Sequence, residues 1–113
     1  MSNVYNSSPI LIDTDVSTGW RAHQTLSHNT YATGLRITKI AMAVGTTSSA
    51  GTVTITDPID GTILYGPMTV DASVAVGSIL FTDNLDTQSL MWRDFNVTGV
   101  TATGTRLYIW YRA

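Results

Sequence analysis

The chain contains no cysteine and no glutamate, and Lys39 is its only lysine. Without cysteine, neither a disulfide framework nor a thiolate metal site can form. All eight acidic residues are aspartates. Aspartate and the abundant threonine favour turns and strands, whereas glutamate and lysine favour exposed helix positions. The composition therefore predicts an all-β protein.

Long apolar runs and basic clusters are also missing. The N-terminal stretch MSNVYNSSPILID has no basic region and an apolar run of only three residues. We therefore expect no signal peptide, no membrane as a partner, and synthesis in the cytoplasm. Six lysines and arginines against eight aspartates give a net charge of −2, and no two basic residues are adjacent. This pattern argues against nucleic acid as a partner.

The length of 113 residues suits one domain. Residues 1–8 are polar and without period, and we expect an extended arm there, with Val4 and Tyr5 as its apolar anchors. Residues 9–113 consist of short apolar-polar segments separated by turn residues. This spacing predicts an antiparallel β-sandwich of about eight strands, jelly-roll-like, with an immunoglobulin-like arrangement as the alternative. The predicted strands are PILID, WRAHQT, LRITKIAMAV, GTVTITD, GTILYG, VAVGSILFTD, SLMWRDF and TRLYIWYR.

The clearest hairpin is TVTITDPIDGTILY, in which alternating valine, isoleucine and threonine surround a turn that contains proline and glycine. The alternation along all the predicted strands also indicates a core. We expect these side chains to be largely buried: Ile37, Ile40, Met42, Val53, Ile55, Leu64, Ile79, Phe81, Leu107 and Ile109.

The last strand, TRLYIWYR, is the richest in aromatic residues. Side chains alternate between the two faces of a strand, so Leu107, Ile109 and Tyr111 share one face. The opposite face carries Tyr108 and Trp110 between two arginines, a composition enriched in protein–protein interfaces. Either this face contacts another chain, or a loop or strand of the same chain covers it. The predicted contact residues are Val4, Tyr5, Arg106, Tyr108, Trp110 and Arg112.

Catalytic and metal-binding motifs are not recognisable. His23 and His28 are five residues apart, which does not place them on one face of a strand as a pair of metal ligands. The segment DPIDG lacks the alternating ligands of a calcium loop and suits a turn. There is no G-x-S-x-G elbow and no recognisable base. We therefore expect no enzyme activity, no catalytic residue, no metal and no cofactor.

The three tryptophans, Trp20, Trp92 and Trp110, suggest a second kind of function. Small β-sandwiches often bind glycans on exposed aromatic rings. Tryptophan in a small β protein is more often part of the core or of an interface. A glycan-binding module therefore stays open as the alternative to a protein-binding one.

The arm MSNVYNSSP, the hairpin GTVTITDPIDGTILYGP and the closing segment VTGVTATGTRLYIWYR together resemble the small decoration, or cement, proteins of tailed-bacteriophage capsids. The resemblance implies a jelly-roll-like or immunoglobulin-like sandwich that self-associates as a dimer or trimer. It also implies binding to the major capsid protein on the outer surface of the virion, at junctions between capsid subunits, where the chain stabilises the shell. It identifies no individual functional residue. The alternative is a glycan-binding or host-attachment module of a phage particle.

Overall fold

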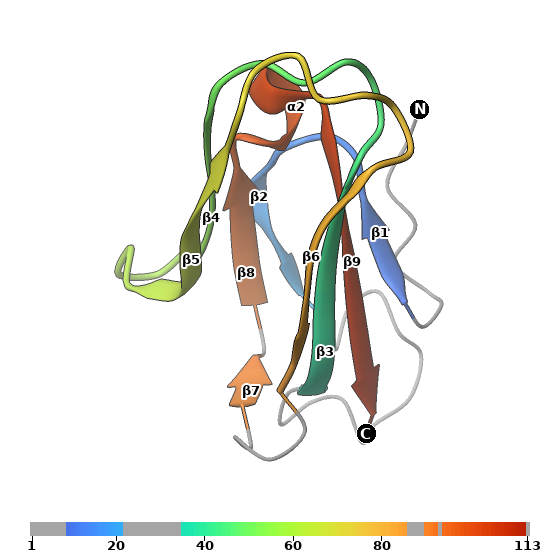
Figure 1. Cartoon of the computed structure of the whole chain (residues 1–113). Coiled ribbons are helices and arrows are strands. Elements are labelled where there is room, and N and C mark those ends of the chain that lie inside the picture. The colour runs from blue at the N-terminus through green and yellow to red at the C-terminus, as the bar shows by residue number, and fades with distance from the viewer. Residues whose placement is uncertain (1–8, 22–34, 86–89, 93, 113) are drawn as a thin grey trace.

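The computed structural model describes residues 9–21, 35–85, 90–92 and 94–112. These residues form two antiparallel sheets that pack face to face, with one short helix at one end (Figure 1). The expected all-β sandwich is thereby confirmed.

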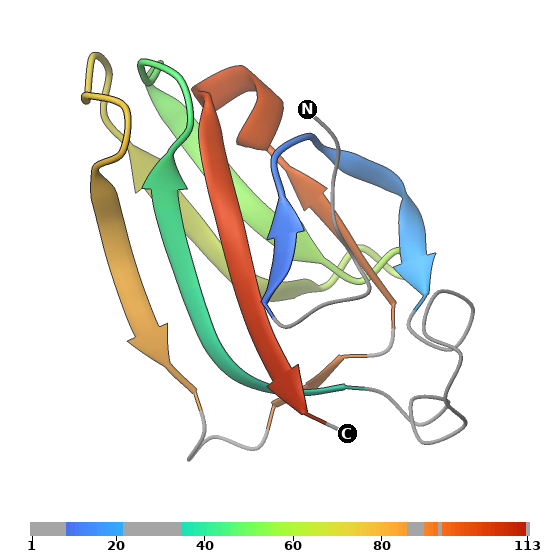
Figure 2. The same ribbon diagram turned by 90° about the vertical axis from the view of Figure 1, so that its right-hand side faces the viewer.

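The first sheet contains four strands side by side and one short additional strand. Their order is β1 (Ile10–Ile12), β9 (Thr105–Arg112), β3 (Leu35–Val44) and β6 (Ile79–Asn84), and β7 (Leu90–Trp92) pairs with the start of β3. Figure 2 shows these strands in front of the other layer, with β9 and β3 in the middle. The side chains of β9 therefore lie at the centre of the sheet.

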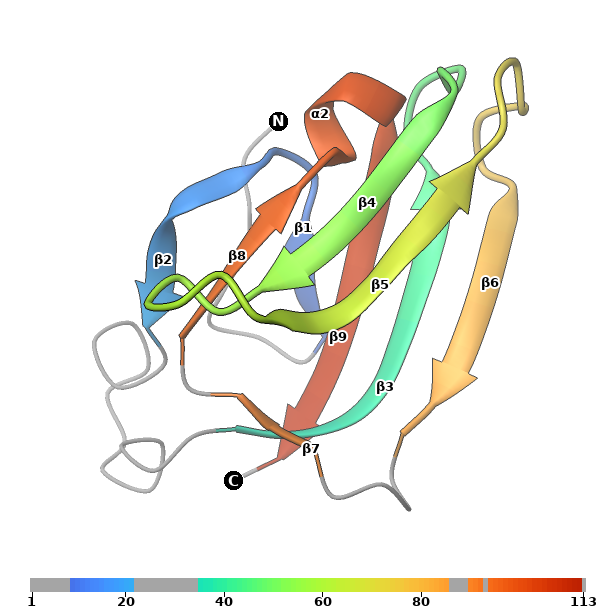
Figure 3. The ribbon, with the colours of Figure 1, turned by 90° about the vertical axis from the view of Figure 1, so that its left-hand side faces the viewer.

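The second sheet faces the viewer in Figure 3. Its order is β2 (Val16–Arg21), β8 (Asp94–Thr98), β4 (Gly51–Thr56) and β5 (Ile63–Val70), and helix α2 (Val100–Thr103) connects β8 to β9. Each of the connections β1–β2, β3–β4, β5–β6 and β8–β9 carries the chain from one sheet to the other.

The strand pairing is that of a jelly roll. The segment β1–β2 runs antiparallel to β8–β9, and β3–β4 runs antiparallel to β5–β6. The pairs β3 with β9 and β4 with β8 join these two ribbons. One long antiparallel ribbon is thus rolled into two sheets, as in double-sheet jelly rolls. The immunoglobulin-like alternative has a different strand order.

The expected count of about eight strands is wrong in one place. The segment SLMWRDF, predicted as one strand, divides between the sheets: Leu90–Trp92 pair with β3, whereas Asp94–Thr98 pair with β2 and β4. Leu90–Trp92 and Asp94–Thr98 thus belong to different sheets, and the described residues contain nine strand segments. The local pattern of residues is continuous across this division and gives no sign of it.

Most of the predicted core is buried between the sheets: Ile37, Ile40, Met42, Val53, Ile55, Leu107 and Ile109. Leu64 and Phe81 are partly buried and pack against this core.

Ile79 was predicted to be buried, and this prediction is wrong, because its side chain is 72% exposed. Phe81 pairs with Met42, but Ile79 pairs with Ala43, and the register shifts between these pairs. A bulge inserts one extra residue and reverses which face the next side chain occupies. Leu80 therefore packs against the core, and Ile79 lies on the outer face.

A hydrogen bond joins the two sheets along the edge formed by β5 and β6. The hydroxyl of Tyr65 in β5 donates to the carboxylate of Asp83 in β6. The Tyr65 ring also stacks on Phe81, with 6.4 Å between ring centroids. Burial, the hydrogen bond and the charge of Asp83 raise the pKa of Tyr65 above its ordinary value of 10.0.

We expect Tyr65→Phe to lower the free energy of unfolding by about 1 to 3 kcal/mol, because the bond to a charged acceptor is lost. The raised pKa adds a pH dependence. Above pH 10.0 the unfolded tyrosine loses its proton while the folded one keeps it, so this contribution to stability is lost as pH rises. Urea unfolding at pH 8 and pH 11 should show a steeper loss for the parent than for Tyr65→Phe. Equal losses would contradict the pKa shift.

Candidate functional site

The outer face of the first sheet carries the aromatic residues of β9. Leu107 and Ile109 are fully buried between the sheets, whereas Arg106, Tyr108 and Trp110 alternate with them and are half-buried on the other side. The alternation predicted for this strand therefore matches the structure. Since β9 lies between β1 and β3, its outer side chains are at the middle of the face.

A groove runs along this face beside the aromatic residues. Tyr108 of β9 pairs with Ala41 of β3, and Arg106 of β9 pairs with Ala43 of β3. Two small side chains therefore lie next to two large ones. Beyond β3, Ile79 and residues of the preceding loop form the other wall. The groove has a volume of about 540 Å³. It is lined by Pro9, Lys39, Ala41, Met42, Ala43, Val44, Gly45, Val76, Gly77, Ile79, Thr82, Arg106, Tyr108 and Trp110.

Trp110 is held by two neighbours from the same face. Its ring and that of Tyr108 are tilted by 33°, with 6.2 Å between centroids. The ammonium of Lys39, which is opposite Trp110 in the register, lies 4.7 Å from the centroid of the indole. This cation–π contact holds a positive charge beside the ring.

Arg106 provides a second positive charge in the groove. Its side chain lies along Gly45, where a Cβ atom would be 2.9 Å from Arg106 Nε. A glycine at position 45 therefore makes room for the arginine. The described residues that line the groove include two cations and no carboxylate, whereas the chain as a whole has a net charge of −2.

Two aliphatic side chains of the opposite wall are exposed. Val76 is 62% exposed and Ile79 is 72% exposed. Exposed aliphatic groups beside half-buried aromatic rings form the kind of patch that marks an interaction surface. This wall was not predictable from the sequence, since its position depends on the bulge in β6 and on the loop before it.

The structure describes the other predicted contact residues only in part. Val4 and Tyr5 lie outside the described residues. Arg112 ends β9 opposite Arg36. Among the described residues, Lys39 of the neighbouring strand β3 and Tyr108 contact Trp110, and Tyr108 and Trp110 both line the groove.

The tryptophans considered as sugar platforms differ from one another. Trp92 is only 3% exposed and packs on Phe95, with 5.9 Å between ring centroids, so it belongs to the core. The side chain of Trp20 lies outside what the structure describes. Of the two tryptophans whose side chains the structure describes, Trp110 lines the groove.

The candidate metal ligands give no site in the described part of the chain. His23 and His28 lie outside it, and no group of three or more potential ligands is found within it. In DPIDG, the carboxylates accept backbone hydrogen bonds: Ile59 donates to Asp57 Oδ1 (2.8 Å) and Thr62 donates to Asp60 Oδ1 (2.9 Å). These bonds are those of a turn, as the sequence predicted.

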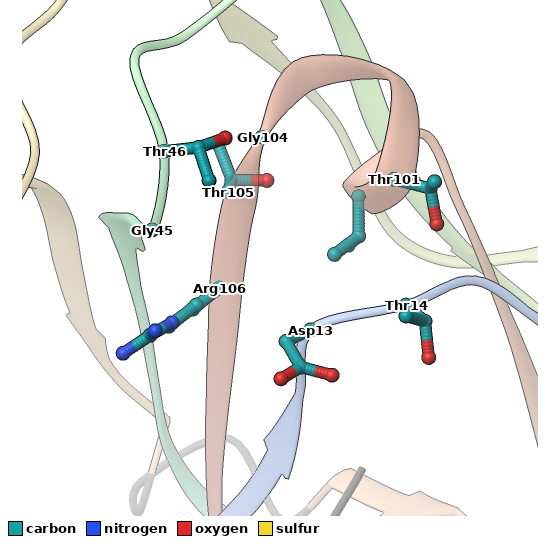
Figure 4. Close-up of a pocket in the computed structure, with 9 residues that line it drawn as sticks. Asp13, Thr14, Gly45, Thr46, Thr101, Gly104, Thr105 and Arg106 are labelled. Carbon is teal, nitrogen blue, oxygen red and sulfur yellow. The ribbon is translucent and has the colours of Figure 1, made fainter. Parts of the chain in front are cut away.

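A second, smaller hollow lies where β1, β9 and α2 meet (Figure 4). Its volume is about 220 Å³, and threonines and glycines form much of its lining. Next to it, the backbone of Asp15 donates to Thr101 Oγ1 and the backbone of Thr101 donates to Asp15 Oδ1, each at 3.0 Å. These bonds fasten α2 to the turn between β1 and β2. We assign this hollow to the packing of the helix.

Comparison with protein families, with curated proteins and with solved structures gives no match. Among the described residues, no helix has the length and apolar character needed to cross a membrane.

Proposed function

We propose that the chain is a structural protein of a phage virion. In this proposal it binds the outer surface of the capsid at junctions between major capsid subunits and stabilises the shell. The observation that carries the proposal is the outer face of the first sheet, where Tyr108 and Trp110 line an open groove whose far wall consists of exposed aliphatic side chains.

The chemistry of this face favours protein as the ligand. Aromatic residues and arginine are enriched in protein interfaces, and acidic residues are depleted. Val76 and Ile79 offer aliphatic surface to a partner, and burying such surface favours association. Lys39 already lies against the indole of Trp110, which leaves less of that ring for a sugar to stack on.

The glycan-binding alternative is favoured by one observation. The groove volume of about 540 Å³ falls in the range of pockets for small ligands, roughly 300 to 1,000 Å³, and an aromatic pair lines it. The fold supports both candidates, because jelly rolls occur among viral capsid proteins and among lectins. The choice must therefore be made from the site and by experiment.

Co-sedimentation separates the two candidates. We expect the purified protein to sediment with undecorated shells assembled from the major capsid protein encoded with it, and to bind no member of a carbohydrate array. Retention on the array together with absence from the shell pellet would contradict the proposal and support the glycan-binding alternative.

We expect Trp110→Ala to weaken binding to shells roughly thirtyfold, because a buried aromatic anchor typically contributes about 2 kcal/mol or more. A titration of shells with labelled protein measures this change. Thr69→Ala, at an exposed position of β5 in the second sheet, is the control and should bind like the parent. If Trp110→Ala keeps its circular dichroism spectrum and binds with parental affinity, the interface lies elsewhere.

We also expect deletion of residues 1–8 to reduce occupancy of the shell without unfolding the sandwich, because Val4 and Tyr5 are proposed as further contacts. Negative-stain images of decorated shells give the occupancy, and thermal unfolding provides the folding control. If the protein without residues 1–8 occupies the shell as fully as the parent does, the arm is not part of the proposed interface.

A further inference from the structure

The turn between β4 and β5 displays an aliphatic side chain at its tip. Ile59 is 85% exposed, and the turn that carries it is tightly bonded. The backbone of Asp57 donates to the carbonyl of Thr62 (2.8 Å), and the backbone of Gly61 donates to the carbonyl of Asp57 (2.9 Å). The tip is therefore a defined structure that holds a large apolar group in solvent.

Two carboxylates flank this isoleucine. Asp57 accepts a hydrogen bond from the backbone of Ile59 itself, and Asp60 accepts one from the backbone of Thr62. The bonds from Thr62 lower the pKa of Asp60, so its carboxylate is charged at neutral pH. The hairpin tip thus combines one exposed aliphatic group with two fixed acidic groups.

The groove on the first sheet has the complementary chemistry. It offers aromatic and aliphatic walls for an apolar side chain, and Lys39 and Arg106 line it as cations. Its volume of about 540 Å³ exceeds the roughly 150 Å³ that a benzene-sized apolar group needs, so an isoleucine side chain can enter it. An aliphatic group flanked by carboxylates therefore fits a groove that has apolar walls and positive charge.

We propose that the groove of one copy of this chain binds the β4–β5 hairpin tip of a second copy. Ile59 enters the groove beside Trp110, and Asp57 and Asp60 lie near Lys39 and Arg106. This inference rests on the proposed function in that it names one partner of the same protein-binding face.

The two surfaces lie on different sides of the molecule, so the contact is between copies. Figure 3 shows the hairpin tip at one side of the second sheet and β6, which bounds the groove, at the opposite side. Contact between two different surfaces is heterologous, and it generates a ring or an open chain of copies. One hairpin tip buries less area than a standard interface, so the contact is weak between free copies. On a shell, linked copies gain avidity.

Sedimentation velocity of the free protein tests this contact without any shell. Between about 10 µM and 1 mM, a range suited to weak contacts, we expect the parent to sediment faster as concentration rises. Ile59→Asp and Trp110→Ala should each remain monomeric over the same range. The conservative variant Ile59→Val should associate like the parent, and circular dichroism checks that each variant is folded.

The decisive experiment mixes Ile59→Asp with Trp110→Ala, the two variants that should not associate alone. Ile59→Asp keeps an intact groove, and Trp110→Ala keeps an intact hairpin tip. A heterologous contact predicts that an equimolar mixture forms a species of two chains although neither variant associates alone. Added salt should weaken this species, because charges contribute to it.

Three results would overturn the inference: a parent that stays monomeric throughout, an Ile59→Asp variant that associates like the parent, or a mixture that stays monomeric. A monomeric parent that still binds shells through Trp110 would place a shell chain in the groove and leave the proposed function intact. Association that depends on Ile59 and Trp110, in a protein that fails to bind shells, would instead support the inference and contradict the proposed function.

Discussion

Replacing Ile109 by alanine should lower the free energy of unfolding by about 2 to 5 kcal/mol, the usual range for a large aliphatic side chain in a core. Ile109 is fully buried in β9 and pairs with Ile10 in β1 and with Ile40 in β3. Both neighbours are also fully buried. The cavity left by the truncation lies at the centre of the first sheet, where surrounding strands restrict relaxation.

Urea unfolding followed by circular dichroism measures this change, and Ile79→Ala is its matched control. The same substitution at a side chain that is 72% exposed should change stability by less than about 0.5 kcal/mol. The pair also tests the bulge in β6, because without it Ile79 would be a core residue. Similar losses in both variants would contradict the assignment of faces.

Gly99→Ala should be comparably destabilising, by about 2 to 5 kcal/mol. Gly99 precedes α2 with a φ of 96°, a conformation that side chains disfavour. A Cβ atom at this position would also overlap the backbone carbonyl of Thr52 in β4. Because the overlap is with backbone rather than with a flexible side chain, either the helix or β4 must move.

Gly61→Ala separates these two causes. Gly61 has a φ of 76° but no atom within 4 Å of the position of a Cβ. This variant should therefore lose only the conformational part, about 1 to 2 kcal/mol. Equal losses of stability for the two variants, measured by the same urea titrations, would show that the close approach of Gly99 to β4 contributes nothing.

The two faces of β9 could be predicted from sequence because the strand is regular. Its side chains alternate without interruption from Arg106 to Trp110, so the buried and outer sets follow from the period alone. The turn at DPIDG was predictable for a similar reason, since the bonding of its aspartates is local. In both cases the residues that determine the structure are close in sequence.

Features that depend on distant pairing were not predictable. The exposure of Ile79 follows from a shift in the register between β6 and β3. The groove requires the alanines of β3 to lie between the aromatic residues of β9 and a wall formed by β6 and its preceding loop. Likewise, the core position of Trp92 depends on the pairing of Leu90–Trp92 with β3, whereas Asp94–Thr98 belong to the other sheet.

In the proposed function, other protein chains cover the outer face of the first sheet when the protein is bound to a shell. Hydroxyl-radical footprinting of the protein, free at low concentration and bound to shells, tests it at the residues concerned. We predict that oxidation of Tyr108 and Trp110 slows several-fold on the shell, while oxidation of the buried Trp92 stays low in both states. If Tyr108 and Trp110 are oxidised as fast in the bound protein as in the free protein, the proposed coverage of this face is contradicted.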